Sequence, residues 1–388
     1  MKNNNKIIYI VGGFQLPNKN ASAIRAITMA NIFSKIGYKV KIIGKLEDGT
    51  NKVKLSNNIA LLSIKNSRTK KYDYFYSSEV IKSYIEKEKD HIHCVFMYNY
   101  PSVGLFLTNK MCKKKGIPTG MDVTEWYGYE PHYPHIVLYK FFDTFLRMRF
   151  LLKGMSNLIC ISQFLLNKYR NNFNSIYIPY VMETNRNYHI ENKSITKPNK
   201  KTFIYAGSPG KNLHKEWLPY VVNSFLELSK LGYDFNLKII GITSNDYCKA
   251  TNISKKILDT NTKIKFFGKL CHSDVVDHLQ ESDFSIFFRD VNRVTMAGFP
   301  TKFAESLSNG IPVITNPTSD IESFVSNGKN GFLIHNLNTN EILKYLKNIL
   351  DMDYSEVHKM KKYCQNNNPF ISEKWEKQIE DFLHQIRI

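Results

Sequence analysis

The sequence contains no run of about 18 apolar residues, so no segment is expected to cross a membrane as a helix. The first residues, Met1–Lys6, are polar and lead into a predicted strand; they lack the apolar core and cleavage site of a signal peptide. The six cysteines show no Cys-x-x-Cys spacing, which argues against a zinc site and against a disulfide framework. These absences favour a protein of the reducing cytoplasm.

Acidic residues are scarce relative to basic ones: 34 Asp and Glu stand against 54 Lys and Arg, which gives a net charge of +20. Such an excess predicts an anionic partner: nucleic acid, an acidic membrane surface or a phosphorylated substrate. No helix-turn-helix or RNA-binding signature accompanies the charge, so nucleic acid is not expected as a partner. A generally basic, solvated surface is the alternative interpretation.

The pattern of apolar segments predicts a doubly wound α/β fold. Ile7–Val11 is a predicted strand, Gly12–Gly13 a turn, Ala21–Ile36 a helix and Lys39–Gly44 the next strand. The polar residues 182–200 suit a linker, after which the alternation of strands and helices restarts.

A chain of 388 residues is long enough for two domains, each with its own core. We therefore expect an N-terminal Rossmann-like domain over residues 1–185 and a C-terminal one over residues 200–368. Residues 369–388 are expected to form a helix that crosses back to the N-terminal domain. Ligands of such folds bind at the carboxyl ends of the strands.

The segment from Ala297 to Ile314 carries the clearest chemical signal. Gly298 and Pro300 mark a turn, Thr301 is the expected N-cap of a short helix, and Gly310 is the expected stop. A loop that enters a helix N-terminus presents unpaired N–H groups, which favour an anion such as a diphosphate. Glu305 lies one turn further along, where its carboxylate would accept hydrogen bonds from both ribose hydroxyls.

Together with other segments of the chain, this segment resembles the donor site of the retaining family-4 glycosyltransferases of the GT-B fold, in a Phe-Pro-Thr-Lys version of the donor loop. The other matching segments are 156–162, 176–180, 202–211, 266–268, 282–284 and 328–334. The resemblance implies two Rossmann-like domains that face each other across a cleft. It also implies transfer of a sugar from a nucleoside diphosphate donor to a glycan or lipid-linked acceptor, in bacterial-type synthesis of a surface polysaccharide such as lipopolysaccharide or capsule. No cofactor and no metal are expected.

The resemblance also assigns roles to residues of the C-terminal domain. The implied donor-binding residues are Gly207, Ser208, Lys211, Lys215, Arg293, Gly298, Phe299, Thr301, Lys302 and Glu305. Lys211 and Lys215 compete for the contact with the diphosphate, because the insertion between them makes the alignment ambiguous. Members of the common type carry a second acid eight positions before Glu305, where this chain has Ala297, so the identity of the sugar stays open.

In the N-terminal domain, Gly12 and Gly13 would let the backbone approach a substrate, or they form an ordinary turn. Arg25 lies where the family commonly has a basic residue. Asp122, and after it Glu125, aligns with the strand end near the reacting carbon of the sugar. A carboxylate there would stabilise a cationic transition state or position the acceptor hydroxyl. Helix-capping or surface roles are the alternatives for both acids.

Other polar clusters are expected to be structural. His91, His93 and Cys94 lie together without a second group of metal ligands, and Asp351-Met-Asp353 falls late in the second domain. Two other functions remain open: a nucleotide-sugar epimerase on the same fold, and a basic, non-enzymatic protein that binds nucleic acid or membranes.

The segment from His135 to Gly154 combines many aromatic and aliphatic residues with four interspersed cations. We expect a partly buried helix on the acceptor side, next to an anionic membrane leaflet. The alternative is a long core helix whose basic side chains reach water.

Overall fold

The computed structural model describes residues 6–17, 20–46, 50–64, 78–126, 134–170, 174–183, 200–210, 213 and 215–386, and for 134–137 only the backbone. The chain divides into two compact units. The first consists of Met1–Glu183, Met296–Phe299 and Ile371–Ile388, and the second of Thr184–Thr295 and Pro300–Phe370. Each is an α/β unit built on a largely parallel sheet, which confirms the predicted fold class.

The first unit is built on an eight-stranded sheet with the order β3-β4-β2-β1-β5-β6-β7-β8. Only the edge strand β3 runs antiparallel to its neighbour, β4. In chain order the strands are β1 (Ile7–Gln15), β2 (Lys39–Lys45), β3 (Lys52–Lys54), β4 (Ile59–Ser63), β5 (Ile92–Tyr98), β6 (Thr119–Val123), β7 (Asn157–Cys160) and β8 (Asn174–Tyr177). The central strand β1 is buried along most of its length, as expected for a strand covered on both faces.

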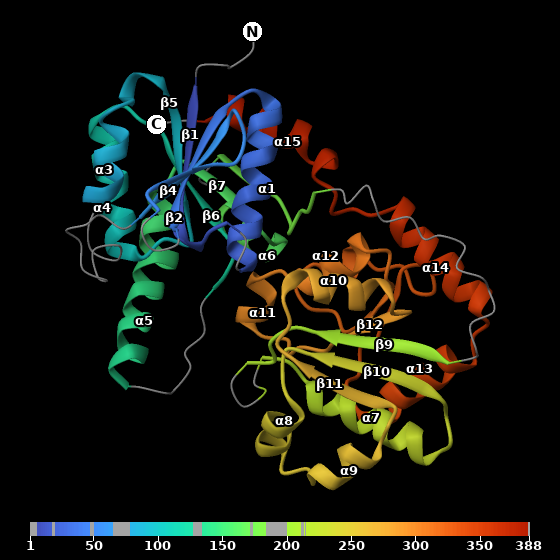
Figure 1. Ribbon diagram of the computed structural model, residues 1–388. Coiled ribbons are helices and arrows are strands. Elements are labelled where there is room, and N and C mark those ends of the chain that lie inside the picture. Colours follow the sequence, from blue (N-terminus) through green and yellow to red (C-terminus); the bar gives the residue numbers. More distant parts are fainter. Residues whose placement is uncertain are drawn as a thin grey trace. The chain divides into compact units, whose positions relative to one another are not determined.

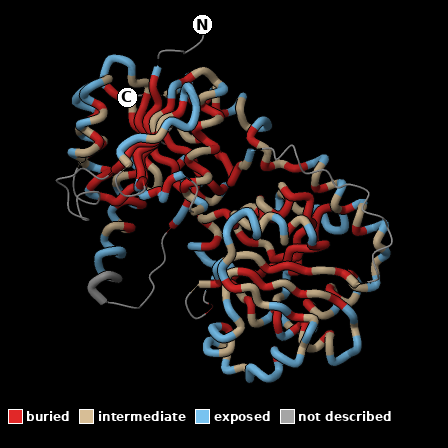
Figure 2. Tube along the Cα trace, in the orientation of Figure 1, coloured by how far each residue is buried: buried red, intermediate tan, exposed pale blue. Residues whose placement is uncertain are grey.

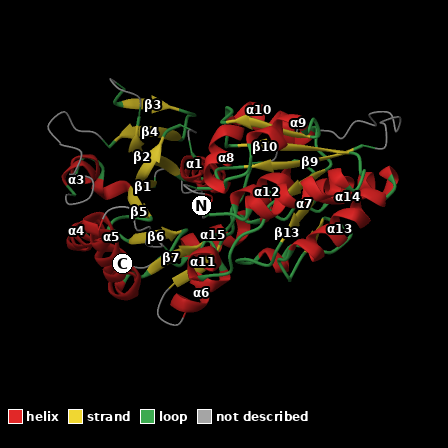
Figure 3. Ribbon diagram, turned by 90° about the horizontal axis from the view of Figure 1, so that it is seen from below, coloured by secondary structure: helices red, strands yellow, loops and turns green. Residues whose placement is uncertain are grey.

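Helices cover both faces of this sheet. They are α1 (Ala21–Ile36), α3 (Glu79–Ile85), α4 (Ser102–Lys114), α5 (Pro134–Leu146), α6 (Gln163–Tyr169) and α15 (Glu376–His384). Figure 1 and Figure 3 show α3, α4 and α5 on one face, and α1 and α15 on the other. Across the described residues of the whole chain, no helix is both long and apolar enough to traverse a bilayer.

Helix α1 begins and ends where its residues dictate. The Asn20 side chain caps its first turn by accepting a hydrogen bond from Ala23 N, and Gly37 ends it with a φ of 110°. The last helix, α15, shares the hydrophobic core between α1 and the sheet through Ile379, Phe382 and Leu383. The end of the chain therefore completes the core of the first unit.

The second unit is built on a six-stranded sheet with the order β11-β10-β9-β12-β13-β14. Its strands are β9 (Lys201–Ala206), β10 (Phe235–Ile240), β11 (Ile264–Gly268), β12 (Phe284–Ile286), β13 (Val313–Thr315) and β14 (Gly331–Leu333), and all their pairings are parallel. Its helices are α7 (Leu218–Lys230), α8 (Ser244–Thr251), α9 (Lys255–Thr260), α10 (His272–Gln280), α12 (Thr301–Ser308), α13 (Thr339–Asp351) and α14 (Tyr354–Asn366), and the short α11 (Arg293–Ala297) precedes α12. In both units the buried residues follow the strands (Figure 2).

Two local expectations are wrong. Gly12–Gly13 do not form a turn, because β1 continues through both glycines and ends at Gln15. The segment from His135 to Gly154 is not one regular helix, since α5 ends at Leu146 and is followed by a π-helical turn, Arg147–Leu151, and a 3-10 turn, Leu152–Gly154. The π-helical turn places Arg147 inside the unit, where its guanidinium donates to the carbonyls of Asn99 and Tyr100 at 3.2 Å.

Candidate donor site and candidate acceptor-side residues

Helix α12 begins where the sequence predicts an anion-binding helix, but with a different first residue. Pro300 is in the N-cap position with an extended backbone, and Thr301 is the first helical residue, so the expectation that Thr301 is the N-cap is wrong. No side chain caps the helix, which leaves the N–H groups of its first turn without a side-chain acceptor. Gly310, with a φ of 71°, follows the C-cap Asn309 and confirms the predicted helix stop.

The turn after β9 lies directly against this helix. Gly207 continues β9 into the turn, and its N–H donates to the Ile240 carbonyl of β10 at 3.1 Å. A Cβ added to Gly207 would lie 2.6 Å from Lys302 Nζ, so the Lys302 side chain of α12 occupies the space beside the glycine. Gly241 follows β10 with a φ of 109°, and a Cβ there would lie 2.1 Å from the Gly207 carbonyl oxygen. Two glycines thus allow the carboxyl ends of β9 and β10 to meet under the α12 N-terminus.

Lys302 is the buried cation of this site. Its ammonium forms an ion pair with Glu216, and both side chains are largely inaccessible, with 13% and 3% of their surface exposed. Burial lowers the pKa of Lys302, and the negative charge of Glu216 opposes that effect. Burial also acts to raise the pKa of Glu216, but Lys302 and the Tyr205 hydroxyl, which donates a hydrogen bond to it, outweigh burial and leave that pKa lowered.

Glu305 lies one turn further along α12 and is half-buried. Burial raises the pKa of its carboxyl above the ordinary value, while the charges of His272 and Lys302 oppose the rise. Within the described part of the chain, no group donates a hydrogen bond to its carboxylate. A carboxylate that is removed from water without a donor is suited to accept hydrogen bonds from a ligand's hydroxyls.

A cavity of about 430 Å³ adjoins the turn after β9. Its lining comes from that turn and from residues that follow β10 and β11: Ser208, Pro209, Gly210, Leu213, Gly241, Ile242, Asp246, Lys249, Ala250 and Lys269.

The remaining predicted donor residues are placed as follows. Lys215 is exposed and packs against Gly210, where an added Cβ would lie 3.0 Å from the lysine Cβ. Lys211 lies outside the described residues, so the choice between the two lysines stays open. Arg293 is exposed at the start of α11.

Gly298 and Phe299 belong to the short segment Met296–Phe299, which is grouped with the first unit rather than with α12. In that unit, the Ser162 hydroxyl at the start of α6 donates to the Ala297 carbonyl at 2.8 Å. The structure therefore brings together Gly207, Lys302 and Glu305 in the second unit. Gly298 and Phe299 are grouped with the first unit.

In the first unit, Arg25 and Asp122 form a buried ion pair. Arg25 Nε and Nη2 donate to the two carboxylate oxygens of Asp122 at 2.8 and 2.9 Å, a bidentate arrangement. The guanidinium also donates to the carbonyls of Ile178 and Pro179 at 3.1 and 2.6 Å. Arg25, the basic residue predicted for an acceptor or phosphate loop, is completely buried and holds Asp122.

Glu125, the second predicted acid, follows β6 and is exposed. Between it and Asp122, Thr124 donates to the Tyr98 hydroxyl at 3.0 Å, and its N–H donates to Asn99 Oδ1 at 2.9 Å. Gly12 is buried and Gly13 exposed within β1. The ends of β5 and β6 therefore carry a polar cluster around Asp122, and Glu125 lies at its exposed side.

Glu216 and Tyr205 were not predicted from the sequence as site residues. Glu216 is separated from Lys302 by 86 positions, and nothing in the local pattern of Lys215-Glu216-Trp217 indicates that this acid is buried. Its only sequence signal is its place directly after a predicted phosphate-binding lysine. Among the residues the structure describes, no group of three or more His, Cys, Asp or Glu side chains is arranged to hold a metal ion.

Comparisons with known proteins cover both the second half of the chain and the chain as a whole. Residues 189–367 match the family model described as Glycosyl transferases group 1. A comparison with curated protein sequences returns no match.

Solved structures resemble the whole chain. Sucrose-phosphate synthase from Thermosynechococcus elongatus is 11% identical, with 98% of each chain covered and a TM-score of 0.73. Anabaena HepE in complex with UDP-glucose is 13% identical, with 98% of this chain and 100% of that chain covered and a TM-score of 0.64. The lipopolysaccharide outer core galactosyltransferase WaaB is 12% identical, with 97% and 99% covered and a TM-score of 0.62.

At such low identity these likenesses establish the fold alone, and the family match covers residues 189–367. The protein is thus a transferase with the two parallel-sheet domains of the GT-B fold, and its residues 189–367 match the Glycosyl transferases group 1 model.

Proposed function

We propose that the protein is a retaining glycosyltransferase that moves a sugar from a nucleoside diphosphate donor to a glycan or lipid-linked acceptor. The observation that carries this proposal is the meeting of Gly207, Lys302 and Glu305 at the uncapped N-terminus of α12. Helix N–H groups and a buried ammonium suit a diphosphate, and a carboxylate one turn away suits ribose hydroxyls. HepE, which has the same fold, was solved with UDP and with UDP-glucose, and this supports a nucleotide-sugar donor.

The chemistry follows from what these groups stabilise. In a front-face mechanism, the bond between the anomeric carbon and the donor's phosphate oxygen breaks, and the acceptor oxygen bonds to the same face of that carbon. The acceptor proton passes to the departing phosphate oxygen. Lys302 and the first N–H groups of α12 would stabilise the negative charge on the leaving diphosphate. No metal and no cofactor are needed for this step, and we propose that none is used.

On the acceptor side we propose that the polar cluster around Asp122 positions the acceptor hydroxyl or stabilises a cationic transition state. Its carboxylate is fixed by Arg25, so its position at the end of β6 is well determined. The charge of Asp122 is balanced by the arginine, which reduces the field that it exerts on a cationic transition state. Glu125, exposed three residues later, carries the second carboxylate that an acceptor hydroxyl would meet.

A direct test incubates the protein with UDP- and GDP-sugars and a mixture of lipid-linked and soluble glycan acceptors. Release of UDP or GDP together with a new α- or β-linkage that retains the donor's configuration is the expected result. A changed nucleotide sugar without transfer would instead indicate an epimerase. Binding of nucleic acid without any turnover would contradict the proposed function.

We further propose that the enzyme acts in bacterial-type synthesis of a surface polysaccharide, such as lipopolysaccharide or capsule, at the cytoplasmic face of a membrane. The lipopolysaccharide galactosyltransferase WaaB has the same fold, which supports this pathway. The first unit also presents an apolar and basic face, defined here as the exposed side chains of α4, α5 and the turn Arg147–Leu151.

Large apolar side chains are concentrated on this face. Among the described residues, fourteen large hydrophobic side chains are exposed, and eight of them lie here: Val103, Phe106, Leu138, Tyr139, Phe141, Phe142, Leu146 and Phe150. Exposed apolar side chains gathered in this way are typical of an interaction site. Aromatic residues are the ones that a membrane interface accommodates best.

The charges on the same face are of one sign. Exposed cations lie among the aromatic residues: Lys110, Lys113, Lys114, Lys140 and Arg149. Lys110 lies over the Phe106 ring and Arg149 over the Phe145 ring, 5.8 and 5.2 Å from the ring centroids. Asp143, the acid within these helices, accepts a hydrogen bond from Ser102 N at 2.6 Å and pairs with Arg147. An anionic membrane complements this combination, since each cation near its surface adds about 1 kcal/mol.

Sedimentation with vesicles of phosphatidylglycerol and phosphatidylcholine tests the membrane proposal. We expect the protein to sediment with these vesicles at low salt and to stay in solution at high salt. The double variant Phe106→Ser/Phe142→Ser should lose most of this binding, whereas Ile257→Ser, with a comparable exposed residue of the second unit, should retain it. Protein that stays in the supernatant at low salt would contradict the proposal and favour a soluble acceptor.

A further inference from the structure

A buried network of three side chains lies behind the α12 N-terminus in the second unit. Lys302 comes from α12, Tyr205 from β9, and Glu216 from the segment between β9 and α7. The Tyr205 hydroxyl donates to Glu216, and the Lys302 ammonium donates to the same carboxylate. Three separate chain segments therefore meet at one buried acid.

The network fixes the ammonium of Lys302 in space. Its Nζ lies 4.3 Å from the centroid of the Tyr205 ring and 5.2 Å from that of Phe287, so two aromatic rings flank it. Gly207 closes another side, because only a residue without a Cβ leaves room for Nζ there. Lysine is ordinarily a mobile point charge, and this packing makes Lys302 an ordered one.

Without Glu216 the ammonium would be poorly stabilised. Burial lowers the pKa of Lys302, and the positive charges of Arg289, from the segment after β12, and of Lys215 lower it further. Two acids face it: Glu216, and Glu305 from its own helix. His272 of α10 acts on Glu305 and not directly on the ammonium. Glu216 is the acid in contact with Lys302, and it is the one that keeps this lysine charged.

We propose that Glu216 is a positioning residue for donor binding: it holds Lys302 charged and fixed beside Gly207, so that Lys302 contacts the diphosphate of the nucleotide sugar. Glu216 itself touches no donor atom and acts through Lys302. Tyr205 orients the Glu216 carboxylate by its hydroxyl. This inference rests on the proposed function, because it concerns the same donor site.

Calorimetric binding of UDP and GDP between pH 7 and pH 9 tests the proposal. The wild-type affinity for the better of the two nucleotides should be nearly constant over this range. Glu216→Gln should bind about tenfold more weakly at pH 7, equivalent to about 1.4 kcal/mol. The loss should grow towards pH 9, because Lys302 without its acid releases its proton at a lower pH. A purely structural defect would not follow the pH in this way.

A double-mutant cycle shows whether Glu216 acts through Lys302. Lys302→Met should bind weakly at every pH, and Glu216→Gln in the Lys302→Met background should cause no further loss. Glu216→Asp keeps the charge, so it should restore the flat pH profile even if its shorter side chain lowers the affinity. This variant also keeps the test valid if Glu216→Gln does not fold, and melting curves identify that case.

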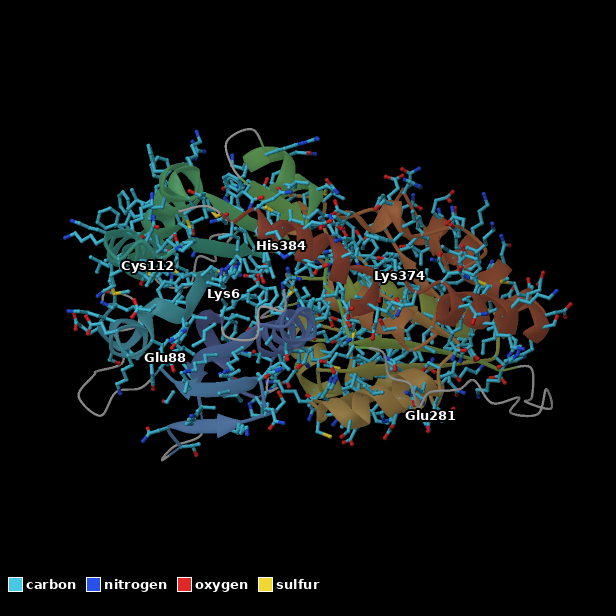
Figure 4. The ribbon with its side chains drawn as sticks, turned by 90° about the horizontal axis from the view of Figure 1, so that it is seen from above. Lys6, Glu88, Cys112, Glu281, Lys374 and His384 are labelled. Atoms are coloured by element: carbon cyan, nitrogen blue, oxygen red, sulfur yellow. The ribbon has the colours of Figure 1, made fainter. Side chains whose placement is uncertain are left out.

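The matched control is Glu281→Gln. Glu281 is the C-cap of α10 and lies at the surface of the same unit (Figure 4). Its carboxylate pairs with Lys238 at 2.8 Å. This substitution should leave the affinity for the nucleotide unchanged.

The outcomes distinguish a failure of the proposed donor site from a failure of the positioning role of Glu216 alone. Wild-type protein that binds neither UDP nor GDP overturns the proposed donor site and, with it, the role of Glu216. Wild-type binding with an unchanged Glu216→Gln affinity and a flat profile overturns the positioning role alone. Tighter binding by Glu216→Gln would also overturn it, since Glu216 would then compete with the diphosphate for Lys302.

Discussion

Replacement of Glu305 is the most direct examination of the donor site. If its carboxylate accepts hydrogen bonds from both ribose hydroxyls, Glu305→Ala removes two bonds to a charged acceptor. Each is worth about 1.5–3 kcal/mol, so the loss is about 3–6 kcal/mol, or about 10²- to 10⁴-fold in the dissociation constant. Isothermal titration calorimetry with UDP and GDP measures this loss. Glu322→Ala, at an exposed acid of the same unit, is the control.

The pH dependence of the same interaction has a definite sign. Burial raises the pKa of Glu305, and only the ionised carboxylate accepts both hydrogen bonds. Nucleotide affinity should therefore fall as the pH falls through this raised pKa, at a higher pH than an ordinary glutamate of pKa about 4.3 would require. Glu305→Gln should bind weakly without this pH step.

The stability of the unliganded protein should change in the opposite sense. A carboxyl whose pKa is raised by folding contributes stability below its unfolded pKa, and this contribution is lost as the pH rises through the folded pKa. At pH 8 the wild-type protein buries an ionised group that Glu305→Gln lacks. The melting temperature of this variant minus that of the wild type should therefore be larger at pH 8 than at pH 4.

A folded Glu305→Ala protein with unchanged nucleotide affinity would refute the ribose role.

Four further predictions concern the rest of the site. Arg25→Ala should lower the free energy of unfolding in urea by about 3–5 kcal/mol, since it leaves the buried carboxylate of Asp122 unpaired; a loss below 1 kcal/mol would mean that water replaces the arginine. Asp122→Asn should reduce kcat more than donor affinity, and unchanged turnover would transfer the role to Glu125. EDTA should leave turnover unaffected, and a loss restored by a divalent cation would contradict the metal-free mechanism. Gly241→Ala should weaken both folding and nucleotide binding, because its Cβ would lie 2.1 Å from the Gly207 carbonyl oxygen; Gly232→Ala, also at positive φ but with no atom within 4 Å, controls for backbone strain alone.

Several features of the fold follow from short stretches of sequence. The apolar pattern of Ala21–Ile36 predicts α1 from local interactions alone, and the structure adds the Asn20 cap and the positive φ of Gly37. The alternation of strands and helices predicts two doubly wound units, because parallel strands require crossover helices. Local patterns failed in two places. Gly12–Gly13 stay in β1, and a Cβ on Gly12 would lie 2.6 Å from the Phe14 ring, so the first glycine makes room for a side chain rather than for a turn. Pro300 is the N-cap of α12, which therefore starts at Thr301.

The sequence by itself determined the class of fold, and it singled out the proposed donor segment and the candidate acid Glu305, since each depends on residues close together in the chain. The tertiary structure decided which charges meet. Arg25 and Asp122 are 97 positions apart and Glu216 and Lys302 are 86 apart, and each pair forms because strand order brings distant segments to one sheet edge. Burial, which depends on that packing, then decides which carboxylate is paired and which stays available to a ligand. Periodicity and spacing along the chain carry no information about which distant charges pair or about which carboxylate is buried.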